Sequence, residues 1–157
     1  QEDFFKRHLP DFADIQRNFV SGDVFLRLCA CHFELGDLEL AELYGDSAIA
    51  CNDGPHKPLA QHLLAKVELQ KPAEQMDLQK VVELNSAALD VNGTLLNAYR
   101  DRAIALQRLG RNDEANADMQ VYERLASLTP AQLEAEIQRQ TEQKTAEFQS
   151  QIKDKFL

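Results

Sequence analysis

Two glycine turns, 74 residues apart, constrain the fold of this chain more than any other feature of its sequence. The first lies in CHFELGDLELAE (31–42) and the second in LQRLGRNDEANA (106–117). In each, a glycine separates two segments with helical spacing of apolar residues, and an alanine follows the glycine five positions later. Glycine readily adopts the left-handed conformation that ends a helix, so both stretches predict a helix–turn–helix unit. Because the unit recurs, we expect a repeated architecture.

Helical spacing of apolar residues extends over nearly the whole chain, and no stretch alternates as a strand would. Asp37, Thr94 and Asn112 stand where they can cap helices. Thr129 to Gln132 reads as a capping box with a proline in the first turn. These signals predict an all-α protein, with helices at about 12–21, 24–35, 37–51, 58–70, 74–90, 95–109, 112–128 and from 129 onward. With 157 residues, 44% of them hydrophobic, the chain can bury one compact core.

A helix–turn–helix unit of about 34 residues resembles the tetratricopeptide repeat (TPR), with the pattern W-x2-L-G-x2-Y, then A-x3-F, then P. Large residues in this pattern fill the gap between paired helices, and small ones let their backbones approach. The first unit has, in order, Phe25, Leu28, Cys29, His32, Ala41, Gly45 and Ala48. The last unit has Tyr99, Arg102, Ala103, Leu106, Ala115 and Met119. The middle unit has Val81 and Ala88.

The resemblance implies a right-handed α-α superhelix of three helical hairpins, at about 23–55, 56–93 and 94–128. A helix in 1–22 would precede the hairpins, and a long helix in 129–157 would cap the last one. Three departures weaken the match: Arg102 replaces leucine, Gly45 replaces an aromatic residue, and the middle unit lacks a glycine turn. The terminal proline is absent from its place in all three units. The alternative is an ordinary helical bundle with hairpins of similar length.

In TPR arrays the first helix of each pair lines a concave groove that holds an extended peptide or a partner helix. The resemblance therefore implies a non-enzymatic module for protein–protein interaction. Transferring the groove positions selects Arg27, Phe33, Glu34, His62, Lys66, Gln70, Asn97, Arg100, Asp101, Gln107 and Arg108. Four of these are Lys or Arg, which favours an acidic peptide as the partner. The alternative is that they are ordinary residues of a solvated face.

One family of TPR co-chaperones grips the acidic tail of heat-shock chaperones through a Lys/Asn/Arg carboxylate clamp. The positions of that clamp correspond here to Leu26, Ala30, Leu63, Asn97 and Asp101, none of them Lys or Arg. The resemblance therefore does not extend to co-chaperones of this kind. A second reading is a dedicated chaperone of secreted proteins, because three-repeat TPR chaperones of type III secretion have a similar length.

A third reading is a structural module that self-assembles or belongs to a larger polypeptide. The last helix has apolar residues on one face, among them Phe148, Ile152 and Phe156. A helix of about 26 residues is near 39 Å long, more than one hairpin can cover. These three side chains are therefore expected to meet a partner or a second copy of the chain. The alternative is a frayed helix end.

Composition and motifs bear on other functions. The net charge of −9 disfavours nucleic-acid binding, and no apolar run is long enough to span a membrane. No motif of a known catalytic or cofactor site is present, so we expect neither an enzyme nor a cofactor. Cys29 and Cys31 point to different sides of a helix and fit a zinc site poorly, so Cys29 is expected in the core. The chain has an odd number of cysteines, Cys29, Cys31 and Cys51, which favours reduced thiols and a cytoplasmic location. The N-terminal residues lack a signal-peptide pattern, although Gln1 suggests a processed or excised chain.

Overall fold

The computed structural model describes residues 22–51 and 54–156. These residues form seven helices and no strand, so the predicted all-α class is confirmed. The helices are α2 (Gly22–Glu34), α3 (Leu38–Ala50), α4 (His56–Gln70), α5 (Leu78–Val91), α6 (Leu96–Arg108), α7 (Asn112–Ala126) and α8 (Pro130–Phe156). The predicted N-terminal helix in 1–22 falls, but for Gly22, outside the described residues.

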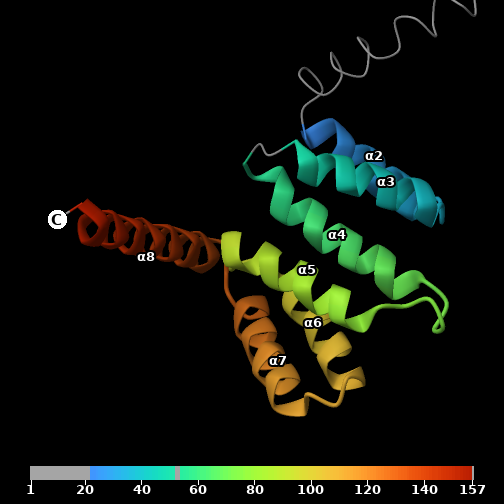
Figure 1. The fold of residues 1–157 in the computed structure, drawn as a ribbon. Coiled ribbons are helices and arrows are strands. Elements are labelled where there is room, and N and C mark those ends of the chain that lie inside the picture. Colours follow the sequence, from blue (N-terminus) through green and yellow to red (C-terminus); the bar gives the residue numbers. More distant parts are fainter. Residues whose placement is uncertain (1–21, 52–53, 157) are drawn as a thin grey trace, which may run out of the picture.

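The helices pack as three successive hairpins (Figure 1). Within the hairpins α2 packs on α3, α4 on α5, and α6 on α7; between them, α3 contacts α4 and α5 contacts α6. In addition, α2 contacts α4 and α4 contacts α6. The first helices of the three hairpins therefore lie next to one another on one side. The result is a helical, repeat-like fold.

The two glycine turns have the same geometry. Gly36 has φ of 78° and Gly110 has φ of 79°, so both adopt the left-handed conformation that the sequence predicts. The N–H of Gly36 donates to Phe33 O, and the next N–H donates to His32 O. Gly110 and its successor repeat these two bonds with Gln107 and Leu106. Both helix ends are thus Schellman motifs, which satisfy two otherwise free carbonyls.

The start of α5 differs from the prediction. The sequence suggested a start at about Glu74, whereas the helix begins at Leu78. Asp77 occupies the N-cap, and its side chain accepts a hydrogen bond from Lys80 N at 3.0 Å. Before it, the N–H of Gln75 donates to Pro72 O in a turn. The connection after α4 is therefore longer than expected, because the stronger capping residue sets the boundary.

Of the four other predicted caps, two are confirmed and two are wrong. Asp37 accepts from Leu40 N at 3.2 Å, and the capping box of Thr129 and Gln132 forms in both directions, so both are confirmed. The predictions that Thr94 and Asn112 cap helices are wrong. Thr94 instead donates its N–H and hydroxyl to Asn92 Oδ1 in the turn before α6, and Asn112 lies just inside α7.

Small buried residues allow the helices to cross closely. Cys29, Ala65 and Ala103 are buried at corresponding places in α2, α4 and α6, and Ala41 and Ala115 in the second helices. They lie in two core clusters, one formed by α2, α3 and α4 and the other by α4 to α7. The predicted core position of Cys29 is confirmed.

Arg102 explains why the last unit departs from the repeat pattern. Its guanidinium donates to both oxygens of Asp118 on α7, at 2.7 and 2.6 Å. A third bond, at 3.1 Å, reaches Ser86 Oγ on α5. The guanidinium also lies 5.8 Å from the centre of the Tyr99 ring. A half-buried ion pair therefore joins three helices at the place where the pattern has leucine.

The last helix contacts the rest of the molecule near its first turns and projects beyond it (Figure 1). None of the residues of α8 is buried, and the helix extends away from the hairpins (Figure 1). It touches them through polar side chains: Glu136 lies 3.7 Å from Arg124, and Lys144 donates to Val91 O at 2.9 Å and to Asp90 O. Leu133, Glu136 and Gln140 are half-buried in these turns, while Ile137 is exposed, so the capping of the last hairpin by α8 stays a prediction.

Candidate functional site

The candidate site is the side of the molecule formed by α2, α4 and α6, which we call the first-helix face. Every residue that the sequence selected for the groove lies on these three helices. Phe33, His62, Lys66 and Arg100 are half-buried, and Asp101 is buried. The others are exposed: Arg27, Glu34, Gln70, Asn97, Gln107 and Arg108. The face therefore offers both packed and free side chains.

A cation–π contact joins the first two helices of the face. The Nζ of Lys66 on α4 lies 5.1 Å from the centre of the Phe33 ring on α2. Such a contact orients an amine over an aromatic surface without neutralising its charge. Lys66 forms no ion pair within the described residues. Its charge is therefore available to a partner.

A polar cluster joins α4, α5 and α6 deeper in the face. His62 Nδ1 lies 2.9 Å from Oδ1 of the buried Asn85, whose amide donates to Val81 O at 3.1 Å. The other ring nitrogen, Nε2, lies 3.9 Å from Asp101 Oδ2, and Arg100 donates to Asp101 Oδ1 at 3.3 Å. The polar atoms of the cluster thus hold one another and fix the spacing of three helices.

The arginines of the face differ in whether they form an ion pair with a carboxylate. Arg27 pairs with Asp23 at 3.0 Å, one turn away on the same helix, and Arg100 pairs with Asp101. Arg108 instead donates to the sulfur of Met76 at 3.5 Å, and no carboxylate of the described residues pairs with it. Lys66 and Arg108 are accordingly the cations of the face best able to bind an anionic group. The sequence could not separate them from Arg27 and Arg100, because the partners depend on side-chain geometry.

The end of the hairpin array carries a hollow between α6 and α7. It is lined by Ala103, Ile104, Gln107, Asn112, Ala115, Asn116 and Met119. Gln107 is therefore shared between this hollow and the first-helix face. Since α8 extends elsewhere, this end of the described hairpins remains open.

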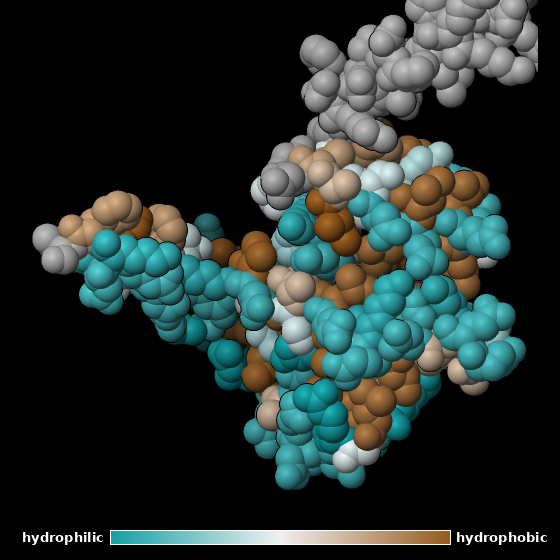
Figure 2. Space-filling model, viewed as in Figure 1, coloured by the Kyte–Doolittle hydropathy of each residue, from teal (hydrophilic) through white to brown (hydrophobic). Residues whose placement is uncertain are grey.

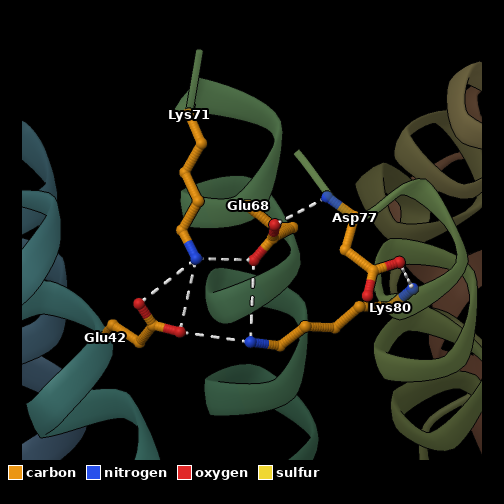
Figure 3. A network of polar contacts seen from close by, with 5 residues as sticks. All are labelled: Glu42, Glu68, Lys71, Asp77 and Lys80. Carbon is orange, nitrogen blue, oxygen red and sulfur yellow. Dashed lines mark hydrogen bonds and ion pairs between the residues drawn. The ribbon is translucent and has the colours of Figure 1, made fainter. Parts of the chain in front are cut away.

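Sequence reasoning missed a network of charged side chains around Glu68 (Figure 3). Glu68 is 2% exposed, yet its carboxylate is fully paired. Oε1 accepts from the backbone N–H of Asp77 at 2.8 Å, and Oε2 accepts from Lys71 Nζ at 2.8 Å. Lys80 Nζ lies 3.6 Å from the same oxygen and 3.1 Å from Glu42 on α3. The network therefore ties α3, α4, α5 and the connection after α4 together.

The charges of this network shift the pKa values of their neighbours. The hydrogen bond to Glu68 raises the pKa of Lys71. Burial alone would raise the pKa of Glu42, but the hydrogen bonds from Lys80 and Lys71 outweigh it and lower that pKa. Both shifts stabilise the charged forms. The network fixes helices in place and is not a reactive cluster.

No motif in the sequence pointed to this network. Its only signal is Glu68 itself, a carboxylate at the place of an aromatic residue in the middle unit. A charge at a core position requires partners, and those partners can be sought among lysines one turn away and on the next helix. Lys71 and Lys80 meet that description.

Comparison with known proteins adds no family. The chain matches no model of a known protein family and no curated protein sequence. Among the described residues, no helix has the length and apolarity needed to cross a membrane. Within the same residues, no three His, Cys, Asp or Glu side chains gather closely enough to hold a metal ion. What the chain does must therefore be argued from its geometry.

Proposed function

We propose that this chain is a non-enzymatic protein-binding module, a divergent array of the tetratricopeptide type. Its first-helix face would hold an extended peptide or a helix of a partner protein. The observation that carries the proposal is the contact of α4 with both α2 and α6, which gathers the first helices on one side. An array of this kind presents a continuous surface to a partner.

The chemistry of the face favours a partner segment that is acidic and partly apolar. Lys66 and Arg108 have no carboxylate partner in the part of the chain that the structure describes, and both lie toward the C-terminal ends of their helices. Phe33, in contact with Lys66, supplies an aromatic surface beside the first cation. Carboxylates of the partner would pair with the two cations while an apolar side chain packs on Phe33. Charge of this kind sets register and speeds association more than it adds affinity.

Affinity capture from a native extract, followed by binding measurements with the captured protein, tests this proposal. The variant Lys66→Glu with Arg108→Glu reverses the two free cations. We expect it to weaken binding about tenfold or more, which corresponds to about 1.4 kcal/mol. Isothermal titration calorimetry at two salt concentrations should also show that the wild-type affinity falls with salt, as screening requires.

A matched control carries the same change of charge elsewhere. Lys57→Glu with Arg124→Glu alters Lys57, on the opposite side of α4 from Lys66, and the exposed Arg124 on α7. We expect this variant to bind as the wild type does. Equal binding by the wild type and the Lys66/Arg108 variant would show that the partner does not use the first-helix face.

A further inference from the structure

The outer part of α8 carries an apolar stripe that nothing in the described structure covers. Phe148 is 64% exposed, Ile152 41% and Phe156 81%. Ile137 belongs to the same stripe, lies nearer the hairpins and is 45% exposed. Figure 2 shows hydrophobic residues gathered along one side of the projecting helix. The stripe borders the side of α8 that faces the hairpins, where Gln140 and Lys144 lie against the connection between α5 and α6.

Two threonines complete this stripe between its apolar residues. At about 100° per residue, Thr141 and Thr145 share a face with Ile137, Phe148 and Ile152. The hydroxyl of Thr141 donates to Ile137 O at 2.9 Å, and that of Thr145 donates to Thr141 O at 2.9 Å. Because both donors are satisfied within the helix, the threonines can be covered without leaving an unpaired donor. Six side chains therefore form one seam over five turns.

One antiparallel register of two such helices pairs every seam position with a useful neighbour. With Ile137 opposite Phe156 of a second copy, Thr141 lies opposite its Ile152, and Thr145 opposite its Phe148. The twofold symmetry repeats these pairs, so each of the six layers contains at least one large apolar side chain. Small threonines thus face large residues, as close packing of helices requires.

The charges beside the seam agree with the same register. Glu142 and Lys153 lie on one edge of the stripe, and the antiparallel arrangement places each beside the other residue of the second copy. Within the described residues Lys153 has no ion pair, and Glu142 accepts only a hydrogen bond, from Gln138 at 3.0 Å. The symmetric dimer would contain this complementary pair twice. A parallel arrangement would instead place this edge of the two helices on opposite sides of the seam, so Glu142 and Lys153 would not meet.

We propose that α8 is a dimerisation helix that pairs antiparallel with α8 of a second copy through the seam Ile137, Thr141, Thr145, Phe148, Ile152 and Phe156. The hairpin arrays then lie at opposite ends of the paired helices. Each dimer presents two first-helix faces, so it can bind two partner segments or one partner with two such segments. The dimer does not depend on the proposed function, since it uses none of the residues of that face.

Sedimentation velocity over a range of concentrations tests the dimer. We expect the wild type to shift from monomer to dimer as its concentration rises. Phe148→Asp with Ile152→Asp should raise the dissociation constant at least tenfold. The control, Ala146→Asp with Ser150→Asp, has the same added charge and spacing on the opposite face of α8, and should dimerise as the wild type does. Circular dichroism on all three proteins checks that α8 stays helical.

A charge exchange tests the register separately. Glu142→Lys alone and Lys153→Glu alone should each weaken the dimer, because each creates two like-charged pairs. The double variant restores both pairs and should recover most of the affinity. A wild type that stays monomeric at every concentration overturns the dimer, and so do equal affinities of the two aspartate variants. A double variant that dimerises more weakly than both single variants overturns the antiparallel register. That result is expected if the stripe instead docks in the α6–α7 hollow of the second copy, where the two charges do not meet.

Discussion

Gly45 lies in the interior of α3, where two other helices approach its backbone. A Cβ atom at this position would lie 2.5 Å from Leu64 Cδ2 on α4 and 3.2 Å from Cys29 Sγ on α2. Any side chain larger than hydrogen would therefore push these helices apart. The absence of a side chain at this residue sets the spacing of the first two hairpins.

Gly45→Ala should therefore destabilise the protein although alanine favours helices. Overpacking costs about 1–3 kcal/mol, and the better helix propensity of alanine returns about 1 kcal/mol. We expect a net loss of up to about 2 kcal/mol in the free energy of unfolding, measured by urea denaturation. Gly93→Ala is the control, since its Cβ would meet mainly the flexible end of Gln140. A stabilised Gly45→Ala would show that α3 and α4 can move apart at no cost.

The thiols of Cys29 and Cys31 should differ widely in reactivity. Cys29 is buried, and burial together with the nearby charge of Asp46 raises the pKa of its thiol to about 11. Cys31 is exposed. Because the thiolate is the reactive form, a thiol reagent at pH 8 should label Cys31 quickly and Cys29 only after unfolding. Peptide mass spectrometry over time measures this order. Equal rates in the folded protein would contradict the packing of α2 against α3.

At the scale of elements, the network around Glu68 accounts for how the irregular middle hairpin is held. The connection between α4 and α5 has no glycine turn, and it is fixed instead by the bond from the N–H of Asp77 to Glu68. Glu68→Ala would leave that N–H and two lysines without their shared partner. We expect a loss of about 1–3 kcal/mol, because the lysines can still reach water. Glu83→Ala, at an exposed glutamate of α5, should change the urea midpoint little.

The same network predicts a dependence of stability on pH. The pKa of Glu42 is lower in the folded protein, so its contribution is present above the ordinary value of 4.5 and is lost as pH falls through the folded value. Glu42→Gln should therefore be less stable than the wild type at pH 7, and the difference should shrink in acid. Urea midpoints at pH 7 and pH 3 for Glu42→Gln and for Glu83→Gln measure this. A difference that is undiminished at pH 3 would exclude the ion pairs as its cause.

Much of the element order could be read from the sequence, because local signals determine it. Gly36, Gly110 and Thr129 act within one turn of their own helices, and each was predicted correctly. The start of α5 and the role of Thr94 were wrong, since several polar residues competed there and only the folded turn selects one. The network of Glu68 and the contact of Arg108 with Met76 were not predictable, because they depend on distances between side chains of different segments.

At the scale of the whole molecule, α8 is attached without a core of its own. None of its residues is buried, and Glu136 and Lys144 make polar contacts with the hairpins. Removal of residues 129–157 should therefore leave α2 to α7 folded, with a thermal midpoint within a few degrees of the full chain. Calorimetry and circular dichroism measure this, and the truncated protein should stay monomeric. Its unfolding would show that α8 stabilises the hairpins more than its exposure indicates.

The amide of Asp77 offers a consequence that concerns the motion of the entire array. This N–H belongs to a connecting segment, yet it donates to a carboxylate that is itself enclosed by α3, α4 and α5. Its proton can be replaced by solvent deuterium only when the hydrogen bond to this enclosed carboxylate opens. Hydrogen exchange at Asp77 should therefore be as slow as in the middle of a helix, and should report the breathing of the first two hairpins as a unit.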